Sequence, residues 1–553
     1  MSIWCSTVCS SWRVSSSWST GSTSCSSSRS CWSPRSCCAG ATDWTRRAPA
    51  LPSPMADLTI QSRGIAWAGV VNLAGGATGS LIGLLLAAVI GRHLGTEGAG
   101  TYFLVVAVFM IVSNVTELGA DTGLVRYVSA ARARGRLADV PALVRMAVAP
   151  VLITGVVLVA VVAGATSTYP DLFAPLPGGL IVIAAGVAVL SALLAVTLAI
   201  SRGLGDVVSY PLLQNITLPV MRLLGVGVAV LAGWGVIGVL GSWLAPVAVV
   251  LALAVAAVAR LTTRHAGSLR VAPVRPSDRR RLSAEFWGFS ATRGVAAAVE
   301  ILLEWMDVIL VGALASPAQA GIYAVVTRCA RAGEVIQQAA RVAVGPQISA
   351  ALARGATHEA REIYGLVTAT MIWLAWPFFL VLAIFGDTVL SLFGPGFSDG
   401  ATSLAVLSLA MALATAAGTV QTILLMGGRS SWQLADKSLA LTLNIALDLV
   451  LIPLWGIDGA ALAWAITIVI DTVVVVWQVQ GLMGVSPAGR HLWSAAALAI
   501  GVAGTLTVGS RIAFGSSLSV MLGTIATVAV VYLVVSWPLR HRLGLVALAE
   551  HRS

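Results

Sequence analysis

The chain has 553 residues, of which 58% are hydrophobic and 10% charged, and its mean hydropathy is +0.90. This composition is typical of a polytopic membrane protein and excludes an ordinary water-soluble domain. The net charge of +11 could indicate nucleic-acid binding, but the distribution of the basic residues along the chain provides a different explanation.

Residues 1–54 precede the hydrophobic part of the chain. They contain six of the seven cysteines and seventeen serines, and no apolar run long enough for a signal peptide or a membrane span. The cysteines show no spacing typical of a metal site. We expect this segment to be an upstream extension produced by a misplaced start, or a disordered Ser-rich tail, with the protein proper beginning at Met55.

Fourteen apolar segments of about 20 residues follow, each long enough to cross a bilayer as a helix. They lie near residues 65–90, 101–121, 143–165, 178–201, 211–232, 236–259, 286–314, 320–348, 366–386, 401–427, 437–455, 458–480, 491–510 and 518–537. The sequence therefore predicts an all-α polytopic membrane protein with about fourteen transmembrane helices.

The basic residues predict the orientation of these helices, because cytoplasmic loops retain Lys and Arg. If both termini are cytoplasmic, the loops at 126–145 and 259–281, which are rich in arginine, lie inside. From Met55 onward, 22 Lys and Arg residues then fall inside, against only Arg92 and Arg511 outside. The positive charge is thus explained by topology, and no nucleic-acid partner is expected.

The chain contains an internal repeat at a constant offset of 221 residues. The matched pairs are Gly91/Gly312, Gly100/Gly321, Tyr102/Tyr323, Trp234/Trp455, Gly235/Gly456 and Gly238/Gly459. Since each half has six spans, both enter the membrane in the same sense, as in transporters with parallel repeats. We expect two pseudo-symmetric six-helix lobes with a cleft between them, which suits alternating access.

The predicted organisation follows from the repeat and the loops. It comprises an extension at 1–54, an N-terminal lobe at 55–260, an Arg-rich cytoplasmic linker at 261–285, a C-terminal lobe at 286–485, and two extra helices with a cytoplasmic tail at 486–553.

Span seven carries four charges on one side. Arg293, Glu300, Glu304 and Asp307 are spaced so that they share a window of roughly 60° on a helix. Charges at this depth are costly in contact with lipid, so this stripe must face protein or water. Interhelical ion pairs that lock the bundle would satisfy this requirement, and so would a hydrated cavity between the lobes.

The second explanation predicts the site residues. The expected cavity residues are Arg222, Arg293, Glu300, Glu304, Asp307, Arg328 and Arg331, whose arginines suit an anionic, phosphate-bearing substrate. The candidate residues for ion coupling are Glu300, Glu304, Asp307, Asp448 and Asp471.

Motifs for enzymatic chemistry are absent from the sequence. The only lysine, Lys437, follows no glycine-rich loop, so the chain has no Walker A motif. No HExxH, GxSxG or CxxC pattern occurs in the membrane part. We expect no enzyme activity, no catalytic residue, no cofactor and no metal, which leaves a secondary transporter or flippase.

Several stretches resemble a known family. GRHLGTEGAGTYFLV, ELGADTGLVRY, MDVILVGALASPAQAGIYAVVTR, VGPQISAAL and IPLWGIDGAALAWA are similar to sequences of the polysaccharide-biosynthesis, Wzx-like flippases of the multidrug/oligosaccharidyl-lipid/polysaccharide exporter superfamily. The resemblance covers about Met55 to Val485. The positions that match the family pattern are Asp307, Tyr323, Arg328, Pro346, Gly456 and Gly459.

The resemblance implies a fourteen-helix protein of two lobes around a V-shaped cavity. Its implied activity is to move a polyprenyl-pyrophosphate-linked oligosaccharide across the cytoplasmic membrane for the synthesis of cell-surface polysaccharide such as O-antigen. The partners would be this lipid-linked glycan, the bilayer and glycan-assembly proteins. Three alternatives remain open: a lipid II flippase, a multidrug cation antiporter of the same superfamily, and a membrane scaffold that transports nothing.

Overall fold

The computed structural model describes residues 54–168, 178–206, 208–264, 276–335, parts of 337–351, 354–426, 430–484 and 489–543. Residues 1–53 of the predicted extension thus lie outside the described residues, and so does Pro346. The chain divides into two units, residues 1–64 and 65–553, and the description below concerns the second.

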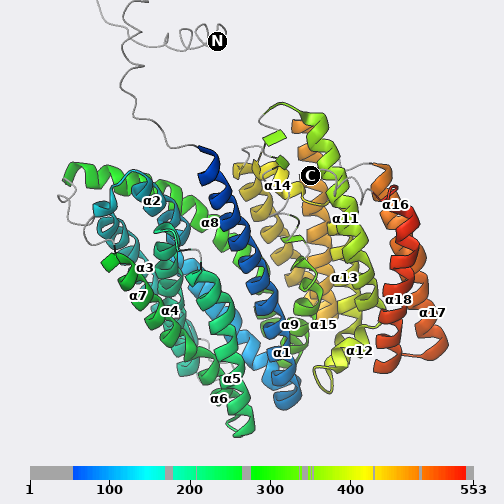
Figure 1. The fold of residues 1–553 in the computed structure, drawn as a ribbon. Helices are drawn as coiled ribbons and strands as arrows, with labels where there is room; N and C mark the ends of the chain where they lie inside the picture. The colour runs from blue at the N-terminus through cyan, green and yellow to red at the C-terminus, as the bar shows by residue number, and fades with distance from the viewer. Residues whose placement is uncertain are drawn as a thin grey trace, which may run out of the picture. The chain divides into compact units, whose positions relative to one another are not determined.

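All regular structure in the described residues is helical, which confirms the all-α class (Figure 1). The first half contains α1 (Pro54–Glu117), α2 (Ala120–Ala133), α3 (Val140–Thr168), α4 (Gly178–Gly203), the π-helix Pro211–Thr217, α5 (Leu218–Leu231), α6 (Gly235–Leu244) and α7 (Pro246–Arg264). The second half contains α8 (Pro276–Leu314), α9 (Pro317–Arg331), α11 (Thr357–Ile384), α12 (Gly386–Ser391), α13 (Ala401–Ala416), α14 (Val420–Met426) and α15 (Ser430–Met483). The C-terminal part contains α16 (Arg490–Leu498), a π-helix (Ala499–Gly504), α17 (Thr505–Phe514) and α18 (Leu518–Leu539).

Two of these elements are too long to be single membrane crossings. α1 has 64 residues, and at 1.5 Å per residue a straight helix of this length would be about three times as long as the 30 Å hydrocarbon layer is thick. The backbone leaves the helical region at Gly95 in α1 and at Gly456 in α15, both with positive φ. Glycine has no Cβ and adopts this conformation without strain, so each element is two helices joined at a sharp turn.

Ten helices of the described residues are long and apolar enough to cross a membrane, two of them these double segments. Charged side chains keep α8 out of this set, although it is 39 residues long. The structure thus confirms a polytopic membrane protein, while the number fourteen stays a prediction.

Positions 221 residues apart share structural features. Gly235 and Gly456 have nearly equal positive φ angles, 62° and 57°. Gly100 and Gly321 pack against each other, since a Cβ on Gly321 would lie 2.6 Å from the Gly100 nitrogen and 2.3 Å from the Thr96 carbonyl oxygen. The repeat therefore places a glycine from each half at the point where α1 and α9 cross.

A second contact between the halves joins the turn between α1 and α2 to α8. Gly119 precedes α2, and a Cβ on it would lie 2.5 Å from the Gly294 nitrogen in α8. Next to this crossing, the Tyr127 hydroxyl donates a hydrogen bond to the Glu285 carbonyl oxygen at 2.8 Å. α8 thus packs on α2 of the first half and on α9 and α15 of the second.

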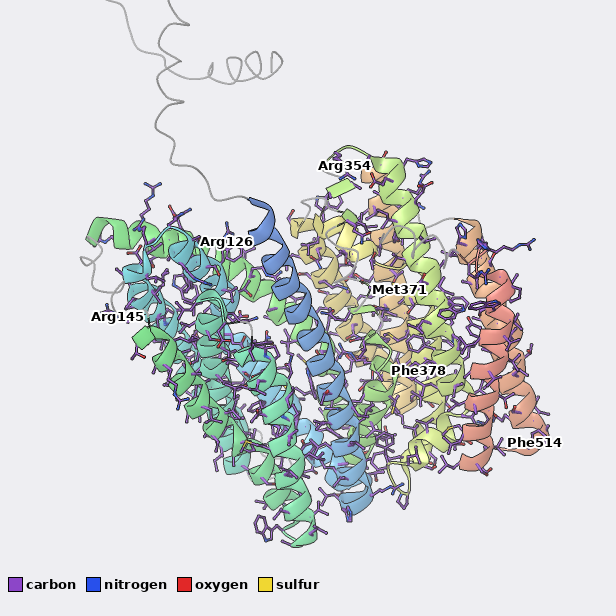
Figure 2. The ribbon with its side chains drawn as sticks, viewed as in Figure 1. Arg126, Arg145, Arg354, Met371, Phe378 and Phe514 are labelled. Carbon is purple, nitrogen blue, oxygen red and sulfur yellow. The ribbon has the colours of Figure 1, made fainter. Side chains whose placement is uncertain are left out.

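Figure 2 shows Arg126, Arg145 and Arg354 toward the end of the helices at which α8 and α11 begin, with Phe514 toward the opposite end. These arginines belong to loops that the sequence assigns to the inside. They share one end, as a positive-inside arrangement requires. Which end faces the cytoplasm stays a prediction.

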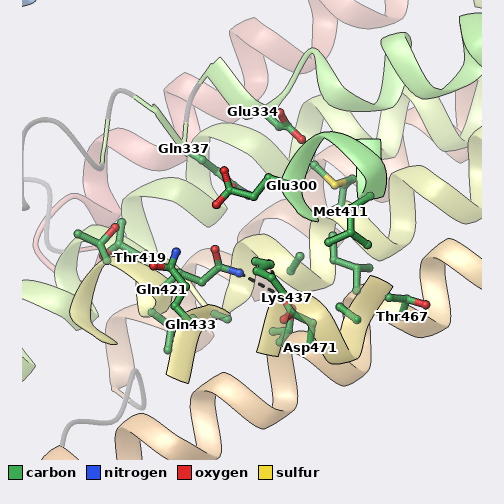
Figure 3. Close-up of a pocket in the computed structure, with 18 of the residues that line it drawn as sticks. Glu300, Glu334, Gln337, Met411, Thr419, Gln421, Gln433, Lys437, Thr467 and Asp471 are labelled. Carbon is green, nitrogen blue, oxygen red and sulfur yellow. Dashed lines mark hydrogen bonds and ion pairs between the residues drawn. The ribbon is translucent and has the colours of Figure 1, made fainter. Parts of the chain in front are cut away.

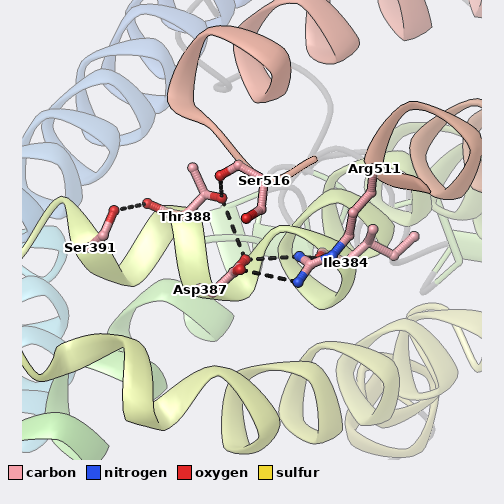
Figure 4. Close-up of polar contacts among 6 residues, drawn as sticks. All are labelled: Ile384, Asp387, Thr388, Ser391, Arg511 and Ser516. Carbon is pink, nitrogen blue, oxygen red and sulfur yellow. Dashed lines mark hydrogen bonds and ion pairs between the residues drawn. The ribbon is translucent and has the colours of Figure 1, made fainter. Parts of the chain in front are cut away.

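The C-terminal helices α16–α18 pack along α11 (Figure 1). At one end of this contact, the Arg511 guanidinium forms an ion pair with Asp387 at 2.8 Å and also donates to the Ile384 carbonyl oxygen (Figure 4). Desolvation alone would raise the pKa of Asp387, but the hydrogen bonds and charge of Arg511, together with hydrogen bonds from Thr388 and Ser516, hold the pKa below its ordinary value of 3.8. The other arginine assigned to the outside, Arg92, donates to the Leu392 carbonyl oxygen just beyond α12.

The glycine crossing yields a first prediction. Gly321→Ala would push a methyl group against backbone atoms that cannot rotate away, and overpacking of this kind costs about 1–3 kcal/mol. We expect a lower unfolding temperature of the purified protein in a thermal melt followed by tryptophan fluorescence. Gly241→Ala is the matched control, because a Cβ there meets nothing within 4 Å. Equal melting of the two variants would contradict the close crossing.

The Arg511–Asp387 pair yields a second prediction. Arg511→Met removes a partly exposed ion pair, so the free energy of unfolding at pH 7 should fall by about 1 kcal/mol. Because the pKa of Asp387 is lowered in the fold, the contribution of the pair is present at neutral pH and is lost as pH falls through that lowered pKa, below 3.8. The difference from the native protein should therefore shrink in acid. A difference that does not change with pH would show that the pair is not its cause, and Arg511→Lys serves as the charge-preserving control.

Candidate functional site

A large cavity of about 520 Å³ lies within the second half of the chain (Figure 3). α8, the end of α9 and the turn after it, α11, α13, α14 and both halves of α15 contribute to its wall. Its polar lining residues are Glu300, Glu304, Arg331, Glu334, Gln337, Thr419, Gln421, Thr422, Gln433, Lys437, Thr467, Asp471 and Thr472. Trp464 and several aliphatic side chains complete the wall.

Two groups of ion pairs line this cavity. Arg331 is 3.0 Å from Glu304 and 3.0 Å from Glu334, so one guanidinium joins α8 to the end of α9. On the other wall, the Lys437 ammonium lies 2.8 Å from Asp471, which also accepts a hydrogen bond from Gln421 at 3.1 Å. Both groups offer polar atoms to the cavity while their charges are matched within the protein.

Two smaller cavities adjoin the large one. A cavity of about 290 Å³ shares Glu304, Arg331 and Glu334 with it and is also lined by Arg328 and by Ser80 of α1. It therefore lies between the two halves of the chain. A cavity of about 340 Å³ is lined by Arg293, Lys437 and Glu300 together with mostly apolar atoms from α8 and α15.

The structure brings together Glu300, Glu304, Arg331 and Asp471 of the predicted site, all in the wall of the 520 Å³ cavity. Glu300 and Glu304 are exposed on α8, and Glu300 forms no ion pair among the described residues. The stripe on span seven thus faces open space at these two positions.

Asp307, one turn beyond Glu304, is buried away from the cavities described above. Its carboxylate accepts a hydrogen bond from the Tyr323 hydroxyl at 3.0 Å and interacts with the carboxyl group of Asp448. Asn444 is fully buried beside them on α15. Apart from this contact between the two carboxyl groups, both oxygens of Asp448, one of Asp307 and both amide atoms of Asn444 have no hydrogen-bond partner in the described structure.

Two arginines of the predicted site pack on aromatic rings. The Arg222 guanidinium lies 3.8 Å from the centre of the Trp243 ring, and its Nε donates to the Trp243 carbonyl oxygen. It belongs to the core of the first half and does not line the cavities described above. Arg328 lies 4.1 Å from the centre of the Phe103 ring and borders the 290 Å³ cavity. Cation–π contacts of this kind stabilise buried guanidinium groups.

The charge balance of the large cavity differs from the sequence-based interpretation. An excess of arginine was expected there, but the wall carries four carboxylates, Glu300, Glu304, Glu334 and Asp471, against the two cations Arg331 and Lys437. The reason is that Arg222 and Arg328 turn toward aromatic rings. The charge balance therefore gives no argument against a cationic substrate.

Sequence reasoning missed Lys437 and Trp464 as wall residues. Lys437 is the only lysine of the chain and stands at the start of an apolar segment, a signal that could have drawn attention to it. Trp464 lies 221 residues after Trp243, an additional pair of the repeat.

Solved structures of low sequence identity share this fold. The lipid II flippase MurJ in an inward closed conformation aligns with a TM-score of 0.66 and 11% identity, over 86% of this chain and 99% of that one. An inward-facing multidrug transporter of the MATE family aligns with a TM-score of 0.57 and 15% identity, over 75% of this chain and 98% of that one. At these identities the likeness concerns the fold alone.

Two curated proteins of Haloferax volcanii are similar in sequence. The probable flippase AglR is 28% identical over 207 residues, which is 35% of this chain and 43% of that protein. The probable low-salt glycan biosynthesis flippase Agl15 is 25% identical over 177 residues, 31% of this chain and 36% of that protein. The matched segments thus span less than half the length of these relatives. The sequence model of the polysaccharide biosynthesis proteins matches residues 66–352, more than half of the chain, and the protein belongs to that family.

Proposed function

We propose that the protein is a flippase that moves a lipid-linked oligosaccharide across the cytoplasmic membrane, with both termini cytoplasmic. The observation that carries this proposal is the polar cavity of about 520 Å³ inside a membrane helix bundle of the polysaccharide biosynthesis family. The names of the two relatives, both probable flippases, support it. A charged glycan headgroup cannot cross hydrocarbon unaided, so it requires such a polar chamber.

The wall of the large cavity has the chemistry that sugars require. Carboxylates such as Glu300 accept hydrogen bonds from hydroxyl groups, and the amides of Gln421 and Gln433 both donate and accept them. Trp464 offers a flat apolar surface for a sugar ring. The volume is within the range of about 300–1,000 Å³ that is usual for ligand pockets.

The phosphate groups of the lipid carrier would occupy the adjoining 340 Å³ cavity. Arg293 is exposed there and forms no ion pair among the described residues, and the Lys437 ammonium lies beside it. Phe289 and Leu434 supply the apolar part of the wall, against which the first isoprene units would pack. A planar guanidinium contacts phosphate oxygens in pairs, which suits Arg293 to this role.

Transport would be coupled to a cation at Asp307, Asn444 and Asp448. Buried carboxylates without partners are costly, and a bound cation would satisfy the oxygens that the protein leaves free. The described residues hold no group of three acidic, histidine or cysteine ligands, so the amide of Asn444 would have to complete the set. Glu300 and Glu304 face the cavity instead and would contact the glycan.

The acidic balance of the large cavity favours a second candidate function, export of an organic cation in exchange for a coupling ion. The four carboxylates of the wall would then bind the substrate directly. Family membership and the relatives support the glycan carrier, which we therefore place first.

Replacing Arg293 and Glu304 together by alanine should reduce polysaccharide export at least about tenfold, because phosphate and sugar contacts are lost together. Lipid-linked glycan should accumulate on the inner leaflet, measured by its accessibility to an enzyme added to inside-out vesicles. The matched control is Arg281→Ala with Glu285→Ala, an exposed pair on the same helix whose side chains line none of the cavities above. Intact export in the first double variant would favour a scaffold, whereas lost efflux of ethidium with intact export would favour the cation exporter.

Asp448→Asn should uncouple transport from its ion gradient. The substitution keeps the shape of the side chain but removes one of the two charges that would hold the cation, so export should fall at least about tenfold. Export is measured in vesicles with and without ionophores that collapse the sodium or the proton gradient. Asp458→Asn is the control, since Asp458 is bound to Ser403 instead. Native export that persists after both gradients have been collapsed would exclude this coupling.

A further inference from the structure

The two antiparallel halves of α15 enclose a second group of acids next to the large cavity. Asp436 and Asp471 come from opposite halves, and each is 7% exposed. Both line a crevice of about 10 Å³, which Leu439, Leu443, Ile470 and Val474 border with apolar atoms. Thr467, one turn from Asp471, also lines it. A space of this volume accommodates about one water molecule or one small ion.

Three oxygen atoms of these residues lack a partner in the described structure: Oδ2 of Asp436, Oδ1 of Asp471 and Oγ1 of Thr467. The opposite oxygens of the two carboxylates are used, since Asp436 accepts from Gln478 at 2.7 Å and Asp471 accepts from Lys437 at 2.8 Å. Those bonds fix the orientation of the carboxylates. Buried oxygens normally have partners, so three free ones on residues that line one crevice indicate a missing ligand.

The charges define the class of ligand. Asp436 and Asp471 carry two negative charges, and the Lys437 ammonium cancels one of them. One negative charge remains, which a monovalent cation would neutralise. Carboxylate and hydroxyl oxygens are ligands for hard cations, and softer metals prefer nitrogen or sulfur.

We propose that Asp436, Asp471 and Thr467 form a binding site for one monovalent cation such as sodium, and that Lys437 restricts this site to monovalent ions. It is distinct from the group around Asp307 and Asp448. Lys437 acts as a built-in counter-ion: with it in place a divalent ion would leave an excess positive charge in a buried crevice.

Lys437 also connects this site to the cavities. Its side chain is 20% exposed, against 4% for that of Asp471. It lines the 520 Å³ cavity, as Figure 3 shows, and also the 340 Å³ cavity. A phosphate group bound there would attract the ammonium away from Asp471 and so strengthen cation binding. This link rests on the proposed function, whereas the cation site itself does not.

The test uses the purified full-length protein in nanodiscs, in an Asp448→Asn background that removes the other candidate site, with ²²Na⁺ and ⁴⁵Ca²⁺ as probes. Asp436→Asn leaves the Lys437–Asp471 pair intact and should abolish sodium binding. Lys437→Gln should strengthen sodium binding at least about tenfold and create calcium binding, because a nearby positive charge is lost. Lys437→Arg keeps the charge and should preserve the selectivity.

Sodium binding that survives Asp436→Asn would overturn the proposal, as would an unchanged affinity and selectivity in a folded Lys437→Gln protein. If Lys437→Gln does not fold, Asp436→Asn decides alone.

Inorganic pyrophosphate should increase sodium binding of the protein that retains Lys437 but not of Lys437→Gln. No effect of pyrophosphate would exclude the link to the cavities. No glycan is present in these assays, so their outcome is separate from that of the export experiments.

Discussion

The free-energy cost of placing a charge in hydrocarbon determines where the charged side chains of this protein can lie. An ionised side chain at the centre of a bilayer costs several kcal/mol unless it meets protein, water or an opposite charge. The charged groups of the second half follow this rule in different ways. Arg331 pairs with two glutamates, Lys437 pairs with Asp471, and Glu300 faces an open cavity. The positions of the cavities thus follow from where the charges can be tolerated.

The two halves of the repeat share aromatic positions but differ in their charged positions. Tyr102 and Trp243 of the first half correspond to Tyr323 and Trp464 of the second, so the aromatic framework is preserved. The charged positions are not preserved between the halves. Those that correspond to Glu304, Asp307 and Asp471 are Gly83, Leu86 and Val250. The polar stripe is therefore confined to the second half, where the 520 Å³ cavity also lies.

The apolar segments were sufficient to predict an all-α membrane protein, and helical spacing placed Glu300 and Glu304 on one face, which lines the 520 Å³ cavity. The repeat offset also identified Gly100 and Gly321, which the fold brings into direct contact. Partners could not be predicted in this way, because a period of 3.6 residues fixes the face of a helix but not what packs against it. Arg222 illustrates the limit: its spacing suits a cavity residue, yet Trp243 offers its ring to the guanidinium at 3.8 Å. Lys437 was overlooked because it is a single charge at the end of a span, and a single charge forms no periodic pattern that could point to a site.

The ion pairs of Arg331 also constrain how the cavities can change shape. Glu304 belongs to α8, Glu334 follows α9, and Arg331 stands between them in the wall of both the 520 Å³ cavity and the 290 Å³ cavity that reaches α1. A rocking motion that separates the halves at α1 must widen the second cavity without breaking these bonds, because all three residues belong to the same half. The close contacts that such a motion would have to open include the glycine crossings at Gly100 and Gly119, which hold no ion pair. The ion pairs of Arg331 therefore stabilise the second half internally. Contacts between the halves are of other kinds: the glycine crossings, the hydrogen bonds of Arg92 and Tyr127 to backbone carbonyl oxygens, and the cation–π contact of Arg328 with Phe103. A motion that separates the halves at these points would break them without separating an ion pair.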